Sequence, residues 1–388
     1  MAHSITKLDA VQHTEHAIVI GAGITGLSIA LHLAEQGVPP LVLEREGVAS
    51  GATGVQPGGV RQQFSTRVNC VLGRESLQVY RRLAERLGVP VAATFDACGY
   101  LFLAHGNERL AELRATVELQ HDVGIPSRMV TPDEAAEIVP GLAVEHVTGA
   151  AYCSEDGYFD RPRAVVEAFA TAARARGVRI RIAEVRRIDR DGDGFHVTLA
   201  DGHVSSERVI VAAGVDTPSL LPELGLPIGS AAKHLFYSDP LPEGMLHPLV
   251  VSAEREFAAK QLADGRLLAS DLAAAGDPSS ARTGWLQRVH DVIGELLPAL
   301  AGVALPTVVS GEYDATPDSQ PIVGPVGPDD GLFVAAGFSG HGFMLAPAIG
   351  RRLADLVLGQ HPDPDPELAS FALARFSGER PPGELQTV

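Results

Sequence analysis

The sequence predicts a mixed α/β fold, in which a Rossmann-type domain with a parallel sheet is interleaved with a second domain built on a largely antiparallel sheet. Two observations predict the parallel sheet. Short apolar strands near both ends of the chain run into glycine-rich turns and then into helical patterns, at residues 17–37 and 333–359. A third short strand, at residues 208–214, brings the middle of the chain back to the same sheet.

Composition and charge limit the kinds of partner. The chain has 388 residues, enough for two domains or for one large interleaved unit. Hydrophobic residues make up 45% and charged residues 20%, as in ordinary soluble proteins. The formal net charge is −17 and no Lys/Arg run is present. We therefore expect neither a nucleic-acid partner nor binding to anionic lipid.

Cysteine spacing and hydropathy indicate the compartment. Cys70, Cys98 and Cys153 are odd in number and widely spaced, which indicates neither a disulfide framework nor a metal site. The first fifteen residues are polar, and no apolar run approaches the roughly 18 residues that span a bilayer. The sequence therefore predicts a cytoplasmic protein with no membrane span and no metal.

The first glycine turn predicts a dinucleotide site. The strand at residues 17–20 ends at Gly21, and Gly21, Gly23 and Gly26 give the spacing G-x-G-x-x-G. The first glycine permits the tight turn, the second leaves room for a pyrophosphate, and the third lets helix and strand pack closely. The next strand, "PLVLE", ends at Glu44, which could accept hydrogen bonds from both ribose hydroxyls and would repel a 2′-phosphate. NADP is therefore disfavoured.

The segments after this turn favour FAD over NAD. Residues 45–64 carry Gly51, Gly54, Gly58 and Gly59 with Ser50 and Thr53, whereas an NAD domain would continue into a crossover helix. A flexible surface loop is the alternative interpretation. The helix that starts near Phe343 would point its positive end at the pyrimidine edge of a flavin, where it favours developing negative charge. An ordinary structural helix start is the alternative there. One extended FAD would use both glycine turns.

With its other motifs, "SEDGYFDRPRAVVEAFATAARARGV", "TPDSQPIVGP" and "GFSGHGFMLAPAIG", the sequence from Ala17 to Leu358 resembles the D-amino-acid-oxidase-like flavoproteins. These include sarcosine oxidase, glycine oxidase and the β subunits of heteromeric sarcosine oxidases and proline dehydrogenases. The resemblance implies FAD-dependent oxidation of a C–N bond in an amine or amino acid, namely a secondary, N-methyl, imino or D-amino acid. A hydride passes to flavin N5 and the resulting imine hydrolyses.

Two other functions remain open at this point. One is a hydroxy-acid or sugar oxidoreductase on the same fold, since fold does not fix chemistry. The other is a β-type subunit that requires partner chains.

The resemblance also implies the FAD-binding residues, which are Gly21, Gly23, Ile24, Gly26, Glu44, Arg45, Ser50, Gly51, Thr53, Gly54, Gly59, Val60, Val185, Ala213, Gly214, Gly337, Gly340, His341, Gly342, Phe343 and Met344.

Departures from the family pattern bear on the flavin and on oxygen. Gly311 stands about where monomeric sarcosine oxidases carry the cysteine that bonds to the flavin, so we expect noncovalent FAD. Met344 replaces a lysine that helps to bind the substrate carboxylate. Leu268 matches the oxygen-activating lysine, whose loss argues for slow reaction with oxygen, although Lys260 could substitute for it. Both an oxidase and a dehydrogenase with another electron acceptor fit these residues.

Four side chains are catalytic candidates: Arg61, His234, Lys260 and His341. Arg61 follows two glycines and could hold a substrate carboxylate bidentately, or could form a salt bridge that supports its loop. His341 could contact the flavin or assist deprotonation of the amine, or could make a structural hydrogen bond. His234 lies in "KHLFY", where Lys233 replaces a family arginine, and could reach a face of the flavin.

The remaining expectations concern the substrate domain. Tyr100 and Phe64 could form aromatic walls or could be plain core residues. Small residues in the stretch 252–277, where the family has aromatic ones, predict a wider pocket and a bulkier amine. The predicted domains are 1–91, 144–230 and 312–388 for FAD, and 92–143 and 231–311 for the substrate. Thr131 should cap a helix in the first insertion. "HPDPDPE" should be a linker, with loosely packed residues after it.

Overall fold

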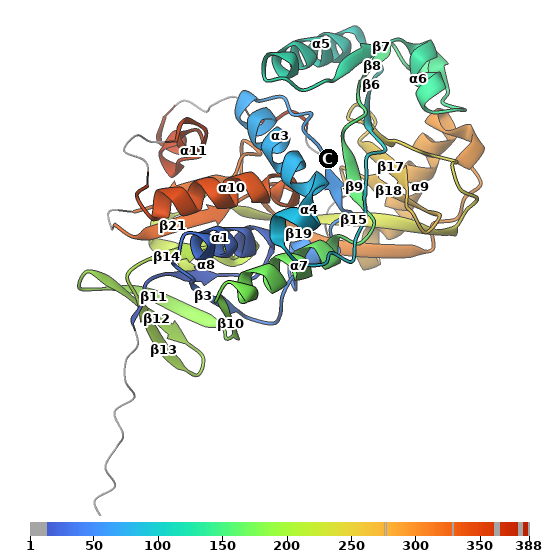
Figure 1. The fold of residues 1–388 in the computed structure, drawn as a ribbon. Coiled ribbons are helices and arrows are strands. Elements are labelled where there is room, and N and C mark those ends of the chain that lie inside the picture. Colours follow the sequence, from blue (N-terminus) through green and yellow to red (C-terminus); the bar gives the residue numbers. More distant parts are fainter. Residues whose placement is uncertain are drawn as a thin grey trace, which may run out of the picture.

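A parallel sheet lies at the centre of one half of the molecule (Figure 1). The computed structural model describes residues 14–274, 276, 278–327, 330–360, 365–378 and 383–386. The strand order is β10 (Arg179–Ile182), β3 (Leu41–Glu44), β2 (Ile18–Ile20), β14 (Val209–Val211), β21 (Leu332–Ala336) and β20 (Ile322–Pro325). Neighbouring strands run parallel except β20, which is antiparallel to β21. The strands from the start, middle and end of the chain therefore form one sheet, as expected.

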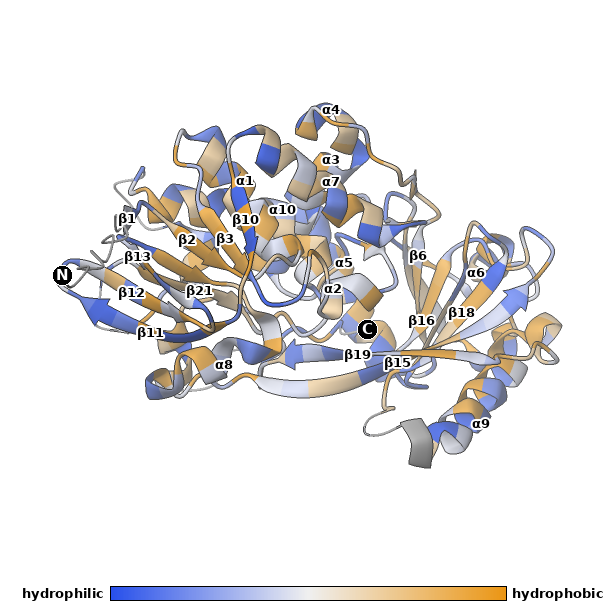
Figure 2. Cartoon of the chain, turned by 90° about the horizontal axis from the view of Figure 1, so that it is seen from below, coloured by the Kyte–Doolittle hydropathy of each residue, from blue (hydrophilic) through white to orange (hydrophobic). Residues whose placement is uncertain are grey.

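Helices cover one face of this sheet and a small second sheet covers the other (Figure 1). The helices are α1 (Ile24–Glu35), α7 (Pro162–Ala175) and α10 (Gly342–Val357), with α3 (Arg67–Arg81) packed on α10. The second sheet consists of β1 (Thr14–Glu15), β13 (Gly202–Ser206), β12 (Gly194–Leu199) and β11 (Val185–Asp191). Since β2 and β3 are buried between two layers they are hydrophobic, whereas β11 is largely hydrophilic (Figure 2).

The other half of the molecule contains a largely antiparallel sheet. Its strand order is β19 (Thr307–Ala315), β15 (Gly229–Pro240), β18 (Arg266–Asp271), β17 (Phe257–Gln261), β16 (Leu249–Ser252), β6 (Tyr100–Ala104), β8 (Gly149–Cys153) and β7 (Arg128–Val130). Only the β16–β6 pair is parallel within these described strands. Helix α9 (Pro278–Leu296) packs on one face of this sheet. The predicted mixed fold is confirmed.

The first insertion contains two helices, of which the second is the one expected after Thr131. Helix α5 (Asn107–Asp122) and helix α6 (Pro132–Ile138) follow β6 and β7. Thr131 caps α6 as predicted: its hydroxyl accepts the Glu134 N–H at 3.3 Å, and the Glu134 carboxylate accepts the Thr131 N–H at 2.7 Å. The larger sheet includes β8 and runs to Ala315 in β19, past the expected limits at 143 and 311. The exact division into domains stays a prediction.

Short elements complete the described chain. A three-stranded sheet of β4 (Gly59–Val60), β9 (Gly157–Phe159) and β5 (Phe95–Asp96) lies between the two halves. The remaining α-helices are α2 (Ala52–Val55), α4 (Leu83–Leu87), α8 (Thr217–Leu220) and α11 (Pro366–Ala369).

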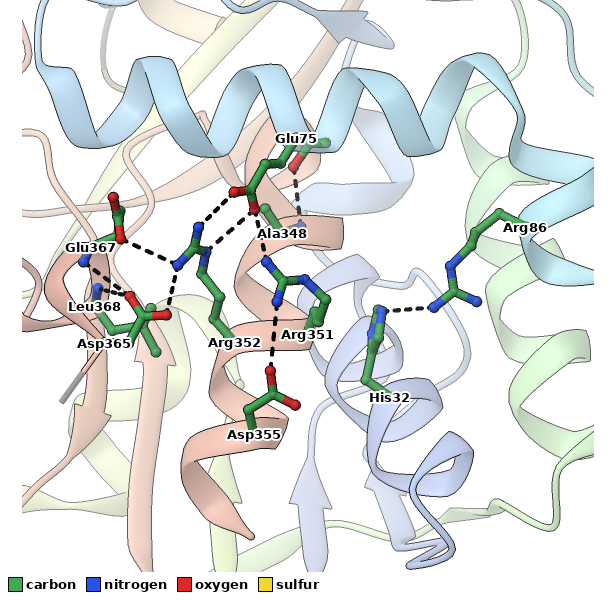
Figure 3. A network of polar contacts seen from close by, with 11 residues as sticks. His32, Glu75, Arg86, Ala348, Arg351, Arg352, Asp355, Asp365, Glu367 and Leu368 are labelled. Carbon is green, nitrogen blue, oxygen red and sulfur yellow. Dashed lines mark hydrogen bonds and ion pairs between the residues drawn. The ribbon is translucent and has the colours of Figure 1, made fainter. Parts of the chain in front are cut away.

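An ion-pair network fastens α10 to α3 and α11 (Figure 3). Arg352 on α10 binds Glu75 at 2.6 Å, Asp365 at 2.7 Å and Glu367 at 3.3 Å. Asp365 also caps α11 through the N–H groups of Glu367 and Leu368. Residues 361–364 of the expected linker lie outside the described residues. The expectation of loose packing after it is wrong, because Phe371 is fully buried and Glu384 is 4% exposed.

Two kinds of feature are absent from the described ranges. None of the helices there combines the length and apolar character that crossing a bilayer requires. No group of three or more His, Cys, Asp or Glu side chains there converges as a metal site. Cys70, Cys98 and Cys153 are buried free thiols.

Candidate functional site

The two glycine turns meet at one edge of the parallel sheet. They follow β2 and β21, which flank β14 and run parallel to it. The carboxyl ends of the strands therefore point to the same edge, and the turns are two strand spacings, or about 10 Å, apart. Helices α1 and α10 then run side by side (Figure 1), joined near their far ends by a 2.8 Å hydrogen bond from Gln36 to Asp355.

The first turn has the backbone geometry that its glycines predict. Gly21 has φ +107°, in the region that favours glycine, and a Cβ there would lie 2.3 Å from the Ala212 carbonyl oxygen. A Cβ at Gly26 would lie 2.1 Å from the Gly21 carbonyl oxygen, so only glycine allows α1 to approach its own turn this closely. Both glycines are therefore required by contacts inside the fold.

A cavity of about 840 Å³ opens from these turns. It is lined by both helix starts, by the end of β3 and by the small segment after β14. The predicted residues that line it are Gly21, Gly23, Ile24, Glu44, Arg45, Ser50, Gly51, Thr53, Val185, Ala213, Gly214, Gly340, Gly342 and Phe343. One continuous cavity thus joins segments more than 300 residues apart in the sequence.

The two helix starts give the cavity a positive end on each side. Within the described chain, neither Gly23, at the start of α1, nor His341, at the start of α10, makes a side-chain capping hydrogen bond. Thr53 comes nearest to capping α1, since its hydroxyl accepts the Ile24 N–H at 3.5 Å. First-turn residues of both helices line the cavity, so their N–H groups can bind an anion there.

Glu44 is held at the sheet edge by backbone groups. Its carboxylate accepts N–H bonds from Ala22 at 2.8 Å and Glu46 at 3.0 Å, and a hydroxyl bond from Ser50 at 3.1 Å. Arg45 pairs with Asp216 at 3.2 Å, which raises the pKa of the arginine. Glu44 is thus fixed in the position from which a ribose could be recognised.

Strand β19 supplies a wall of the cavity that the sequence interpretation missed, except for Gly311. Tyr313 and Asp314 line the cavity, and burial raises the pKa of Tyr313 to about 12. Asp314 accepts the Gly337 N–H at 2.7 Å, and burial raises its pKa also. The family motif "TPDSQPIVGP" begins just after these residues, and this position in the sequence could have indicated that they lie near the site.

Several predicted FAD residues lie outside the lining of this cavity. They are Gly26, Gly54, Gly59, Val60, Gly337, His341 and Met344. The His341 side chain contacts Phe64, with ring centroids 5.3 Å apart, and Arg61, at 3.4 Å. Gly59 and Met344 lie beside Tyr100, since a Cβ at Gly59 would lie 2.2 Å from the Tyr100 hydroxyl and 3.5 Å from the Met344 methyl.

Arg61 is a fully buried cation whose hydrogen bonds go to neutral groups. Its guanidinium donates to the carbonyl oxygens of Gln63 and Gln386, and lies 4.2 Å from the Phe64 ring centroid. Within the described chain none of its hydrogen-bond partners is a carboxylate, and its Nε has no partner. The described residues therefore do not support the alternative that Arg61 forms a salt bridge to hold its loop.

His341 is neutral beside this cation. Burial, and secondly the charge of Arg61, lower its pKa to about 3. Because arginine can only donate, His341 Nε2 accepts from Arg61 and Nδ1 carries the proton.

Asp156 holds the residues after Arg61 in place, and the sequence interpretation also missed it. Its carboxylate accepts the Gln62 N–H at 3.0 Å and the Gln63 side-chain amide at 3.1 Å. Burial raises the pKa of Asp156 to about 6.

Lys260 reaches from β17 to the glycine segment of the other half. Its amine donates to the Pro57 carbonyl at 2.8 Å and lies 3.6 Å from the Tyr158 ring centroid. Lys260 is fully buried, which lowers its pKa to about 7. Leu268 is its direct partner on β18, so both side chains project from the same face of the sheet.

His234 lies on the opposite face of this sheet. Its ring stacks on Trp285 of α9, with centroids 4.2 Å apart, and both ring nitrogens are engaged, by Ser310 at 2.8 Å and the Gly276 carbonyl at 3.1 Å. Lys233 donates to the Leu272 carbonyl at 2.6 Å. These contacts support a structural role for His234.

The fold and the cavity together are those of a protein that can hold an extended dinucleotide. The chain belongs to the DAO family of FAD-dependent oxidoreductases, whose model matches residues 16–356. It is therefore an FAD-dependent enzyme, and the family expected from the motifs is confirmed.

Known proteins resemble the chain over nearly its whole length. 4-Methylaminobutanoate oxidase (formaldehyde-forming) of Paenarthrobacter nicotinovorans is 29% identical over 97% of the chain, which spans 47% of that protein. Glycine oxidase of Geobacillus kaustophilus is 27% identical, with 95% of the chain and 98% of the relative covered. The crystal structure of L-proline dehydrogenase from P. horikoshii superposes with a TM-score of 0.85 and 27% identity, over 95% of this chain and 99% of that one.

Proposed function

We propose that the protein oxidises a C–N bond in an amine or amino acid that carries a carboxylate, with secondary and N-methyl amino acids as the first candidates. The observation that carries the proposal is the single cavity lined by the N-termini of α1 and α10. The names of the relatives supply the chemistry, because they describe an oxidase of a methylamino acid, an oxidase of glycine and a dehydrogenase of proline.

The residues of the cavity fit FAD. First-turn N–H groups of α1 would bind the pyrophosphate, and Glu44 would bind the ribose hydroxyls. The start of α10 would place its positive end near the ring system. When bound, FAD supplies the acceptor for the hydride that leaves the carbon beside the amine.

We assign the substrate carboxylate to Arg61. A buried guanidinium is stabilised most by an anion, and its present partners are neutral carbonyls. Neutral His341 accepts from the same guanidinium and fixes its orientation. Replacing Arg61 by methionine should raise the KM of a carboxylate substrate by at least tenfold, since a lost charged pair costs about 2 kcal/mol.

Lys260 is our candidate for the cation that assists reaction with oxygen. It projects from the same face as Leu268, one strand away from the position that matches the family's oxygen-activating lysine. Its lowered pKa, near 7, predicts that kcat/KM for oxygen falls as pH rises through neutrality. A pH-independent value in the wild type would remove Lys260 from this role and favour a dehydrogenase with another acceptor.

The FAD should be bound noncovalently. Gly311 offers no nucleophile, and Val55 fills the space beside it, since a Cβ at position 311 would lie 2.5 Å from Val55 Cγ2. Acid precipitation of the purified protein should leave the yellow colour in the supernatant. A cytosolic location is also proposed, supported by three buried free thiols.

An anaerobic substrate panel tests the function. N-methyl amino acids, cyclic imino acids and D-amino acids are added to the flavoprotein, and loss of flavin absorbance near about 450 nm is followed. Bleaching by one of these amine classes is expected. Bleaching by hydroxy acids alone would show that the substrate is an alcohol.

A further inference from the structure

A second segment of the chain, Gly383–Gln386, reaches Arg61. We call residues Glu384 to Gln386 the strap. Glu384 and Gln386 are 4% and 2% exposed, whereas Leu385 between them is 62% exposed. The Gln386 carbonyl accepts a hydrogen bond from the Arg61 guanidinium. This is the same group that would bind the substrate carboxylate in the proposed function.

Glu384 anchors the strap at the start of α3. Its carboxylate accepts four hydrogen bonds from the N–H and hydroxyl groups of Ser65 and Thr66, at 2.7 to 3.3 Å, and one from the Asn69 amide at 2.9 Å. The Gln386 N–H bonds to the same carboxylate at 3.0 Å. Ser65 makes a second contact, since its hydroxyl accepts the Leu385 N–H at 2.8 Å. The strap is therefore held at the start of α3 by many more hydrogen bonds than the single one that joins Gln386 to Arg61.

The contact with Arg61 leaves polar groups unsatisfied. Among the described residues, the buried side-chain atoms without a hydrogen-bond partner include Arg61 Nε, Gln63 Oε1, His341 Nδ1 and Gln386 Oε1. All four belong to Arg61 or to residues that contact it. A site with an unpaired guanidinium N–H and an unpaired imidazole N–H suits an anion better than a neutral carbonyl.

We propose that the strap competes with the substrate carboxylate for Arg61, so that Ser65 and Glu384 help to determine which substrates bind. The inference rests on the proposed role of Arg61. A carboxylate that displaces the Gln386 carbonyl gains a charge-assisted pair, whereas an uncharged amine cannot open the contact. The negative charge of Glu384 acts on Arg61 and repels an incoming anion, so an anion must bind Arg61 in good geometry to displace the strap. The strap thus favours substrates whose carboxylate reaches Arg61 in good geometry.

Two variants loosen the strap in different ways. Glu384→Ala removes the anchor and its charge, whereas Ser65→Ala removes one bond to Glu384 and one to Leu385 and keeps the charge. The probes are benzoate and benzamide, which share a shape and differ in charge, titrated into the FAD-bound protein by flavin absorbance. Glu108→Ala, an exposed carboxylate on α5, is the matched control.

Both loosened variants should bind benzoate about tenfold more tightly, the size of one lost competing hydrogen bond, with benzamide and the control unchanged. Benzoate affinity that is undetectable or unchanged in both variants overturns the strap. Arg61→Met tests the underlying assignment separately: benzoate binding that survives it would remove Arg61 as the carboxylate site, whatever the strap variants do.

Discussion

At the scale of single residues, Lys260 is the most perturbed cation of the substrate sheet. Burial lowers its pKa from 10.5 to about 7. Between these values the unfolded chain binds more protons than the folded protein, so this group makes stability rise with pH from about 7 to about 10.5. Below pH 7 the folded protein pays the full cost of burying the charge.

Replacing Lys260 by methionine should remove that dependence. The thermal midpoint of the variant should exceed that of the wild type most near pH 7, and the difference should shrink as pH rises to 9.5. Lys233→Met, at a lysine that is only partly buried, is the control and should show a smaller effect. A difference between Lys260→Met and wild type that is constant with pH would show that the amine keeps an ordinary pKa.

Gly311 tests the packing of the cavity wall at the same scale. A methyl group there would contact Val55, whose branched side chain belongs to the short helix α2 that lines the cavity. Overpacking of this kind costs about 1–3 kcal/mol, so Gly311→Ala should lower the free energy of unfolding by this amount. The double variant Gly311→Ala with Val55→Ala should recover most of the loss in urea unfolding. Equal stabilities of the wild type and the single variant would mean that α2 moves aside without cost.

At the scale of elements, the position of α10 decides whether its start faces the cavity. Arg352 holds this helix to α3 and α11 and is only 12% exposed (Figure 3). Arg352→Met would leave Glu75, Asp365 and Glu367 without their shared cation, which should lower the free energy of unfolding by about 1–3 kcal/mol. Urea unfolding of the apoprotein measures it.

Arg351 provides a matched control on the next residue of α10. It binds Glu75 at 3.0 Å and Asp355 at 3.6 Å, but is 46% exposed. Exposed pairs contribute little, so Arg351→Met should cost less than about 1 kcal/mol. If the two variants were equally stable, the network of Figure 3 would be a surface feature rather than a tie between helices.

At the scale of the whole molecule, the sequence predicted best what depends on neighbouring residues. The turn at Gly21 and Gly26, the acid at Glu44 and the cap at Thr131 are each read within one strand–turn–helix unit. Tyr313 and Asp314 were missed because they reach the cavity through the pairing of β19 with β15, about 80 residues away in sequence.

Long-range contacts also explain the position of His234 and the burial of the strap, which the sequence did not predict. The sequence left open whether His234 reaches the flavin, and strand alternation places its ring against Trp285. The residues of the strap have no periodic pattern, and their burial depends on donors at the start of α3, over 300 residues earlier. Such contacts cannot be derived from local propensity, because the sequence around either partner alone does not indicate that the residue is buried.

We propose that one FAD occupies the cavity that both glycine turns line. A titration of flavin-free protein with FAD measures this directly, followed by flavin fluorescence and by the appearance of bound-flavin absorbance. Saturation is expected at one FAD per chain. Protein that is folded, colourless and unable to take up added FAD would contradict the proposal.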